Sequence, residues 1–326
     1  MLCKRLGYAL GAILVLTGAA GAQQDWPTRP VTMVIPFAAG GPTDVLGRVM
    51  AERMSQILGQ QVVVENVGGA GGMTGSQRVA RAAPDGSSFV LGTVGTHAQN
   101  QTLYKKPAYD AASDFAPAAF IAEVPLVLIT RKDFPANTLQ DFIKYAKENQ
   151  AKMTFGSAGA GSATHLGCVL LNSAMGVDIS HVPYRGTGPA MQDLAGGRID
   201  YMCEIVTTAL PQIEGGAVKA VATLTKARSP VLPKLPTADE QGLKDFEAYT
   251  WNAFFLPKGT PEPIVKKLHE ASVQAMETPA VKDRLQGLGA SLVAPERRSP
   301  DYLAKFVRSE IEKWAVPIKA SGVSME

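Results

Sequence analysis

Apolar residues in the first third of the chain follow two alternating spacings. Short apolar runs, typical of strands, are separated by segments in which apolar residues recur every three or four positions, as on one face of a helix. The clearest helical segment starts at Asp44, keeps this spacing to Leu58 and stops at Gly59. Strands that alternate with helices predict a parallel sheet. We expect strands at 31–36, 61–65 and 88–93, and helices at 44–58 and 73–83.

The same alternation returns in the second half of the chain. There we expect strands at 153–156, 178–182 and 200–203, and helices at 164–175 and 188–194. The segment 123–130 with a helix at 138–148 indicates the crossing into this half. After a Pro-rich surface loop at 229–237, a strand near 248–256 indicates the return, and helices follow at 262–276, 280–287 and 301–319.

Two α/β halves joined by two crossings predict a hinged cleft that can enclose a ligand. The expected fold class is therefore α/β with two domains. The first domain would comprise 23–122 together with 249–326, and the second would comprise 123–248.

The N-terminal segment has the features of a secretory signal peptide. Lys4 and Arg5 precede an apolar stretch, and the small residues at 20–22 precede a polar run. The stretch is shorter than a membrane helix requires. Cys3 lies in the positive region rather than after the apolar stretch, so no lipid anchor is implied. We expect residues 1–22 to be removed on export.

Charge and cysteine content narrow the function classes. The formal net charge is +3, and removal of Lys4 and Arg5 lowers it to +1, so nucleic acid is not an expected partner. With 46% hydrophobic residues, the exported chain can bury two domain cores. Cys168 and Cys203 could form one disulfide if the helix of the first packs beside the strand of the second; two buried, unreactive thiols are the alternative.

Two glycine-rich segments, 36–44 and 156–165, each join an expected strand to an expected helix. Small residues let backbone N–H groups approach a ligand, and the helix start adds a positive dipole end. Thr43 and Asp44 could contact that ligand or simply complete the helix start. One such loop in each half, at the strand ends where open α/β sheets bind ligands, indicates an anion site.

Sequence motifs for three other kinds of site are incomplete in this chain, each at a particular residue. Two positions before Ser157 stands Phe155 rather than the glycine of a hydrolase elbow, and two before Ser162 stands Ala160. The dinucleotide glycine pattern ends at Thr164, and no P-loop lysine follows any glycine run. The run 68–72 is expected to form a tight turn, with ligand contact as the alternative.

The histidines show no metal-ligand spacing, so we expect neither a metal nor a cofactor. His97 and His165 follow strands at the expected cleft and could line it, or could be helix-capping or core residues. His181 and His269 are expected to be structural. Since no nucleophile and base are suitably spaced, we expect a binding protein rather than an enzyme.

Several ordered motifs resemble the Bug/TctC-type periplasmic receptors of tripartite tricarboxylate transporters, over nearly the whole exported chain. The motifs are 26–30, 36–41 with Asp44, 64–66, 82–86, 156–162 with His165 and Leu166, 181–186, 236–237 and 251–257. The resemblance implies a periplasmic, two-domain venus-flytrap fold. It also implies integral membrane transporter subunits as partners, and we expect the receptor itself to be a monomer. A receptor that presents its ligand to a signalling protein and an exported enzyme on the same fold are the alternatives.

By resemblance, the loop after the first strand of each domain binds a ligand carboxylate, partly through water. The residues carried over are Phe37, Ala39, Gly40, Thr43 and Asp44 in the first domain and Ala160, Gly161, Ser162, Thr164 and His165 in the second. Glu204 stands where many relatives have an aspartate beside the ligand. Arg185 could supply a positive charge or form an ion pair within its domain.

The ligand is expected to be a small carboxylate. Two helix starts could hold one carboxylate between them or two at opposite ends of the ligand. Glu204 opposes a second negative charge unless hydrogen bonds or a shared proton offset the repulsion. Apolar contacts and hydroxyls could supply the rest, and the candidates are Tyr201, Met202, Thr93, Thr96, Thr207 and Thr208. We favour a C4 to C8 aliphatic or a benzene dicarboxylate over an amino acid.

Overall fold

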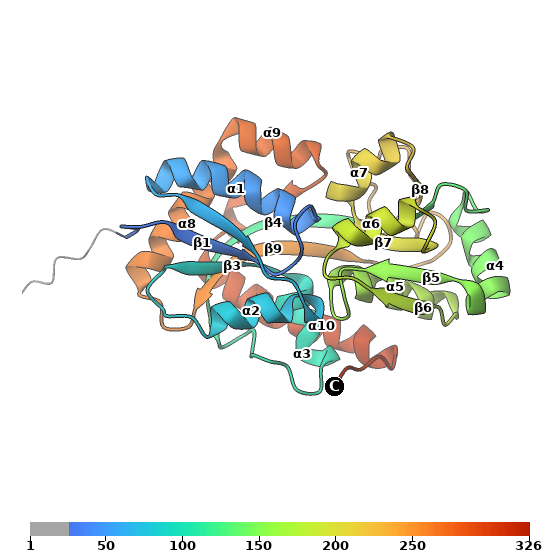
Figure 1. Ribbon diagram of the computed structural model, residues 1–326, viewed down its shortest axis with the longest axis horizontal. Helices are drawn as coiled ribbons and strands as arrows, with labels where there is room; N and C mark the ends of the chain where they lie inside the picture. The colour runs from blue at the N-terminus through green and yellow to red at the C-terminus, as the bar shows by residue number, and fades with distance from the viewer. Residues whose placement is uncertain (1–25) are drawn as a thin grey trace, which may run out of the picture.

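The computed structural model describes residues 26–326, so the predicted signal peptide lies outside the described residues. The described chain forms two α/β lobes that lie side by side along the long axis of the molecule (Figure 1). Strand β4, Phe115–Arg131, begins in the first lobe and ends in the second. The chain returns to the first lobe at β9, Tyr249–Pro257. The two predicted crossings are therefore present.

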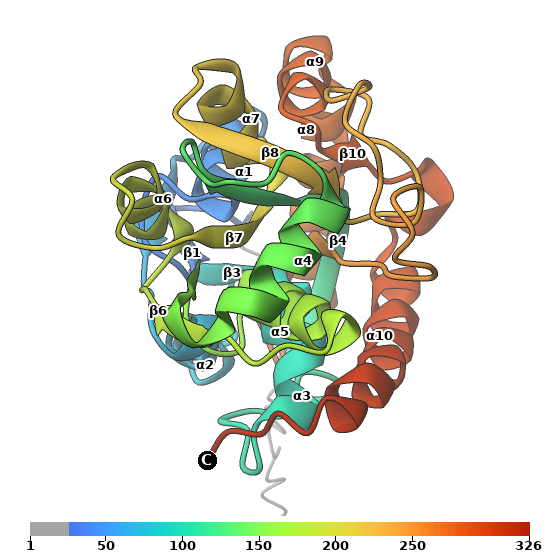
Figure 2. The same ribbon diagram turned by 90° about the vertical axis from the view of Figure 1, so that its right-hand side faces the viewer.

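Lobe 1 is built on the strands β2, β1, β3, β9 and the first part of β4, in that order. The strands β1, Val31–Ile35, β2, Val62–Asn66, and β3, Ser88–Thr93, are parallel, whereas β9 is antiparallel to β3. The helices of this lobe are α1, Pro42–Leu58; α2, Met73–Ala80; α3, Asn100–Leu103; α8, Glu262–Glu277; α9, Pro279–Gly287; and α10, Pro300–Ala320. Helices α1, α8 and α9 pack on one face of this sheet and α2, α3 and α10 on the opposite face, so that in Figure 2 α8 and α9 lie above α10.

Lobe 2 continues the same sheet from the second part of β4 through β7, Tyr201–Ile205, and β5, Thr154–Ser157, to β6, Ser180–Pro183. Strand β8, Val218–Thr223, also pairs with β4, as does the short β10, Ser291–Leu292, of lobe 1. The helices are α4, Leu139–Asn149; α5, Ala163–Met175; α6, Thr187–Ala195; and α7, Val206–Glu214.

Helix α1 shows how sequence and packing agree. Its buried stripe includes Leu46, Met50 and Met54, which recur at helical spacing. Gly47 faces the sheet, because a Cβ there would lie 2.7 Å from the Ile35 side chain. Gly59, with a φ of 69°, ends the helix in the left-handed conformation. The helix begins two residues before the predicted start because Pro42 is favourable in a first turn.

The predicted elements are present to within a few residues, but the pattern missed others. Strand β4 starts at Phe115 rather than at residue 123. A π-helical turn, Gly95–Gln99, leads into α3, and α7 and β8 occupy a segment for which we expected no element. Helix α7 contains Pro211, which argues against a helix in a sequence pattern.

Helix α5 packs beside β7, the arrangement that a disulfide would have required. Cys168 and Cys203 are nevertheless free and buried, and the Cys203 backbone N–H donates a 2.9 Å hydrogen bond to the Cys168 sulfur. The structure therefore matches the alternative of two buried thiols. From residue 26 onward, no helix is both long enough and apolar enough to span a membrane.

Candidate ligand-binding site

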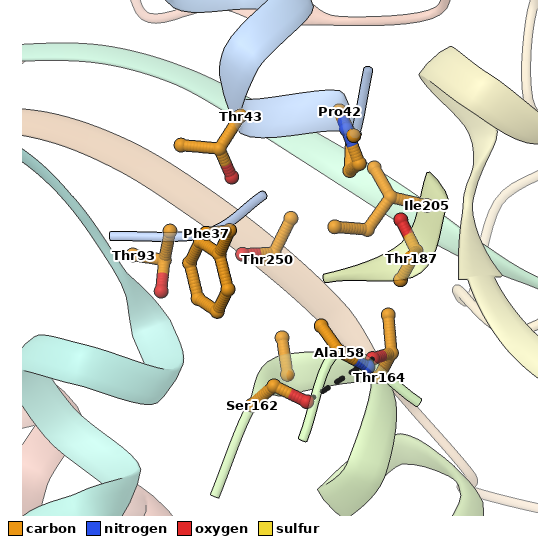
Figure 3. Close-up of a pocket in the computed structure, with 12 residues that line it drawn as sticks. Phe37, Pro42, Thr43, Thr93, Ala158, Ser162, Thr164, Thr187, Ile205 and Thr250 are labelled. Atoms are coloured by element: carbon orange, nitrogen blue, oxygen red, sulfur yellow. Dashed lines mark hydrogen bonds between the residues drawn. The ribbon is translucent and has the colours of Figure 1, made fainter. Parts of the chain in front are cut away.

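A small closed cavity lies where the two lobes meet (Figure 3). Its volume of about 20 Å³ leaves room for about one water molecule. Figure 3 shows wall residues from both lobes facing this space, with Thr250 of β9 behind them. The wall residues are Phe37, Gly41, Pro42, Thr43, Thr93, Ala158, Ser162, Ala163, Thr164, Thr187, Ile205 and Thr250.

The lobes are closed onto each other around this cavity. The Ala38 backbone N–H in lobe 1 donates a 3.0 Å hydrogen bond to the Arg185 carbonyl in lobe 2. The Tyr104 hydroxyl donates another, of 3.1 Å, to the Ala160 carbonyl. The contact leaves no room for a side chain at Gly186, where a Cβ would lie 2.8 Å from the Ala38 nitrogen. The structure is thus a closed state in which backbone meets backbone.

Four helices begin at the cavity wall. The starts of α1 and α5 contribute Thr43 and Ala163, α6 begins at Thr187, and Ile205 immediately precedes α7. The N-cap residues of α1, α6 and α7 make no side-chain capping hydrogen bond. Helix N-termini carry partial positive charge and free N–H donors. Their convergence makes the cavity wall electrostatically favourable to an anion.

Hydroxyl groups supply the polar side chains of the wall. They belong to Thr43, Thr93, Ser162, Thr164, Thr187 and Thr250. The Thr187 hydroxyl has no hydrogen-bond partner although the residue is only 2% exposed. Among the described residues, no lysine, arginine or carboxylate lines the cavity. An anion held here would therefore be stabilised by dipoles and hydroxyls rather than by a full positive charge.

The second glycine loop is held in shape from within lobe 2. The Ser162 hydroxyl donates to the Gly159 carbonyl at 2.7 Å and accepts from the His165 backbone N–H at 3.2 Å, which caps α5. The Thr164 hydroxyl accepts from the Ala158 N–H at 3.0 Å. Both side chains remain on the cavity wall, so these two predicted site residues combine capping with exposure to the cavity.

Gly161 lies in the same loop but not on the wall. Its φ of 87° favours glycine, and a Cβ would lie 2.3 Å from the Asn100 side-chain oxygen in lobe 1. Its N–H donates to the His165 Nδ1 at 3.2 Å, so this donor is already used within the loop. Gly161 and Ala160 therefore form the contact between the lobes, which differs from the direct ligand contact that we expected.

The first glycine loop is closed by Asp44. One oxygen of its carboxylate accepts from the Gly40 N–H and the other from Asn66, both at 2.9 Å, and Arg48 lies 3.0 Å from each. Burial raises the pKa of Asp44, but the hydrogen bonds from Arg48, Gly40 and Asn66 outweigh burial and hold it below its usual value. Asp44 does not line the cavity, and both of its carboxylate oxygens are occupied by these hydrogen bonds.

The predicted histidines lie behind the wall rather than on it. His97 is fully buried, stacks on Phe255 with ring centres 3.9 Å apart, and places Nδ1 2.8 Å from the Thr96 hydroxyl. His165 accepts the Gly161 N–H and stacks beside His181. Burial lowers the pKa of His97 and, together with His181, that of His165 to about 3. Both are core residues that shape the site.

His181 hydrogen-bonds to the second glycine loop from within lobe 2. Its Nε2 lies 2.6 Å from the Ser157 hydroxyl, which also accepts the Gly159 N–H at 3.0 Å. Ser157 is fully buried behind the loop. This serine and histidine pair therefore orders the loop backbone.

Glu204 is fully buried at the end of β7 and does not line the cavity. One carboxylate oxygen accepts from the Thr208 hydroxyl at 2.8 Å, and the other has no partner. Burial raises the pKa of Glu204 to about 7, although the Thr208 hydroxyl, the Ile205 backbone N–H and the Thr187 hydroxyl, which lies nearby but beyond hydrogen-bond distance, favour the ionised form. A carboxyl in this position is close to half protonated at neutral pH.

The remaining predicted residues divide between cavity, groove and surface. Phe37 and Thr43 line the cavity, whereas Ala39 and Gly40 line a neighbouring groove. Arg185 has an exposed side chain and uses its carbonyl in lobe closure. In residues 26–326, no cluster of three or more histidine, cysteine or acidic residues is arranged to hold a metal ion.

Outside the two predicted glycine loops, sequence reasoning missed three wall residues, Thr187, Ile205 and Thr250. Thr187 follows Gly186 at a third strand-to-helix turn, so the same signal that marked the two glycine loops could have identified it. Ile205 and Thr250 carried no such signal. The first ends a strand before an unpredicted helix, and the second lies within β9.

Comparison with known proteins places the chain in a family. The family described as tripartite tricarboxylate transporter family receptor, TctC, matches residues 46–323. An Agrobacterium vitis protein of the UPF0065 group is 44% identical over 308 residues, which cover 94% of this chain and 89% of the relative.

Two solved structures share the fold. MatC from Rhodopseudomonas palustris with bound malate is 43% identical, with a TM-score of 0.88 over 90% of this chain and 100% of that chain. An R. palustris protein with adipate is 35% identical, with a TM-score of 0.87 over 92% of this chain and 99% of that chain. The resemblance inferred from the sequence motifs and the two-domain periplasmic-binding-protein fold are both confirmed. The chain belongs to the TctC family of tripartite tricarboxylate transporter receptors.

Proposed function

We propose that this protein is a periplasmic receptor that captures a small dicarboxylate between its lobes and delivers it to the membrane subunits of a tripartite tricarboxylate transporter. The observation that carries the proposal is the convergence of four helix N-termini and six hydroxyl groups on one cavity at the lobe contact. Such a wall favours carboxylate oxygens, which accept hydrogen bonds from every group that faces them.

Closure supplies the binding mechanism. The closed cavity has room for about one water molecule, so a dicarboxylate must enter while the lobes are apart and must hold the walls further apart than they are here. Lobe 1 contributes the start of α1, and lobe 2 contributes the starts of α5, α6 and α7, so neither lobe alone forms the complete site. A ligand that contacts both sets stabilises a closed form over an open one, by the difference between its affinities for the two.

The ligand class follows from the balance of charge. The wall offers dipoles and hydroxyls without a carboxylate, so it has no evident partner for the ammonium group of an amino acid. Malate in MatC and adipate in the R. palustris relative support a dicarboxylate for this chain also. Phe37 and Ile205 provide apolar contacts for the carbon chain between two carboxylates.

The test is a thermal-shift panel on the exported chain, residues 23–326, with monocarboxylates, dicarboxylates, tricarboxylates and amino acids at millimolar concentration. A ligand that binds only the native state raises the melting temperature with the logarithm of its concentration over Kd. We expect dicarboxylates to give the largest shifts, with 1:1 calorimetric stoichiometry. Stabilisation by amino acids alone, with every dicarboxylate inert, would contradict the proposal.

A further inference from the structure

An open groove of about 600 Å³ lies beside the closed cavity. On the lobe 2 side it follows α6 and α7, and on the lobe 1 side it is bounded by the first glycine loop and by α9. Ala39 and Gly40, which the sequence assigned to the ligand, face this groove rather than the cavity. The proposed site thus has an open extension between the same two lobes.

Thr187 forms the boundary between the two spaces, because it lines both the cavity and the groove. Its hydroxyl lies across the lobe contact, 3.5 Å from where a Cβ on Gly41 would be placed. The side chain is 98% buried, and its hydroxyl has no partner among the described residues. A buried hydroxyl without a partner is costly unless a ligand or water completes it.

The groove combines an apolar wall with one cation. Val45, Met191 and Leu288 supply the apolar surface, and Arg284 is exposed on its α9 side. Arg284 makes no ion pair with a described residue, although many arginines of this chain do, such as Arg48 with Asp44. The Glu204 carboxylate accepts a hydrogen bond from Thr208, which lines the groove, but Glu204 itself does not line it. This arrangement matches a methylene chain that ends in a carboxylate.

We propose that the groove is a second subsite that receives the distal methylene groups and carboxylate of linear dicarboxylates longer than four carbons, with Thr187 at the junction and Arg284 pairing with the distal carboxylate. The inference rests on the proposed function, since the first carboxylate would occupy the cavity. The groove then discriminates between dicarboxylates by the length of their carbon chain. Once the ligand holds the walls apart, a C4 acid would occupy the widened cavity alone, whereas a C8 acid would extend past Thr187.

The experiment compares succinate and suberate by calorimetry at one pH and one ionic strength, in the wild type and in three variants. Arg284→Gln removes the cation, and Lys282→Gln removes an exposed cation of the same helix that does not line the groove. Gln192→Trp fills the groove from an exposed position on α6. The quantity measured is the ratio of the two dissociation constants, which cancels general effects on stability.

We expect Arg284→Gln to weaken the binding of suberate relative to that of succinate by about threefold, which corresponds to the loss of a partly exposed ion pair. Gln192→Trp should shift the ratio in the same direction by a larger factor, and Lys282→Gln should leave it at the wild-type value. An unchanged ratio in both groove variants would overturn the subsite, as would a wild type that binds succinate but not suberate. A wild type that binds neither acid nor any other dicarboxylate would instead overturn the proposed function, and the subsite with it.

Discussion

The backbone N–H of Ala38 donates a 3.0 Å hydrogen bond to the carbonyl oxygen of Arg185, and this bond joins the first glycine loop of lobe 1 to the turn before α6 in lobe 2. The bond can exist only while the lobes are closed. Because it uses backbone atoms, no side-chain substitution removes it directly. Its neighbour Gly186 offers the means to test closure.

Gly186→Ala should prevent full closure while leaving each lobe folded. The added Cβ would lie 2.8 Å from the Ala38 nitrogen, and its φ of 165° is extended backbone that alanine also adopts. Small-angle scattering should therefore show a larger radius of gyration, and dicarboxylate affinity should fall by at least tenfold. Gly287→Ala, with no atom within 4 Å of the added Cβ, is the matched control. A closed shape with unchanged affinity would show that this contact does not govern closure.

Thr187→Val should weaken ligand binding without weakening the fold. The hydroxyl makes no hydrogen bond within 3.5 Å in the closed protein, so its replacement by a methyl group removes only its weak, longer-range effect on Glu204. A carboxylate that uses this hydroxyl would lose about tenfold in affinity. Thr223→Val is the control, because that hydroxyl is also buried without a partner but lies away from the cavity. Equal affinities for the two variants would contradict the assignment of Thr187 to the site.

Glu204→Gln should make stability less dependent on pH. The pKa of Glu204 is raised from 4.5 to about 7 by burial, so this carboxyl is protonated in both folded and unfolded states well below pH 4.5 and ionised in both well above pH 7. The native state therefore loses stability as pH rises through this window, on the order of 3 kcal/mol in total.

The measurement is the difference in unfolding free energy between Glu204→Gln and the wild type, taken by urea titration at pH 4.5 and pH 8. Any cost of the amide itself is common to both pH values and cancels. We expect the variant to gain relative to the wild type on going to pH 8. A difference that is independent of pH would mean that Glu204 is not held in the protonated form by burial.

The double variant Cys168→Ser and Cys203→Ser should bind dicarboxylate with unchanged affinity. Both thiols lie in the packing between α5 and β7, and neither lines the cavity or the groove. Circular dichroism would establish that the variant is folded before calorimetry is performed. A large loss of affinity in a folded variant would contradict this prediction and would connect the core of lobe 2 to the site.

The fold was largely predictable because most of its elements have clean periodicity and defined ends. Helix α1 combines a helical apolar stripe with Pro42 at one end and Gly59 at the other. Helix α7 escaped prediction because Pro211 interrupts its pattern, although the packing of Val206 and Leu210 in the core offsets that penalty. The domain boundaries at 122/123 and 248/249 stay a prediction.

The site was predictable where one segment carries both the loop and the wall residue, as with Ser162 and Thr164. The structure differs from the sequence-based expectation where the position of a side chain depends on the hydrogen bonds around it. Asp44 and His165 have side chains that suit a ligand, but each is already committed to a loop N–H. Thr250 reaches the cavity only because β9 returns from lobe 2 at that point, which no local pattern indicates.

Strand β4 exchanges partners along its length, and this ties the two lobes together thermodynamically. Its residues up to Pro125 pair with β9, and from Leu126 onward they pair with β7 and β8. Melting lobe 2 would remove β7 and β8 from one end of a strand whose other end pairs with β9 in lobe 1, so the loss of one lobe's sheet destabilises the other. The unfolding of this receptor should therefore be a single cooperative transition, with equal calorimetric and van't Hoff enthalpies, despite its two cores.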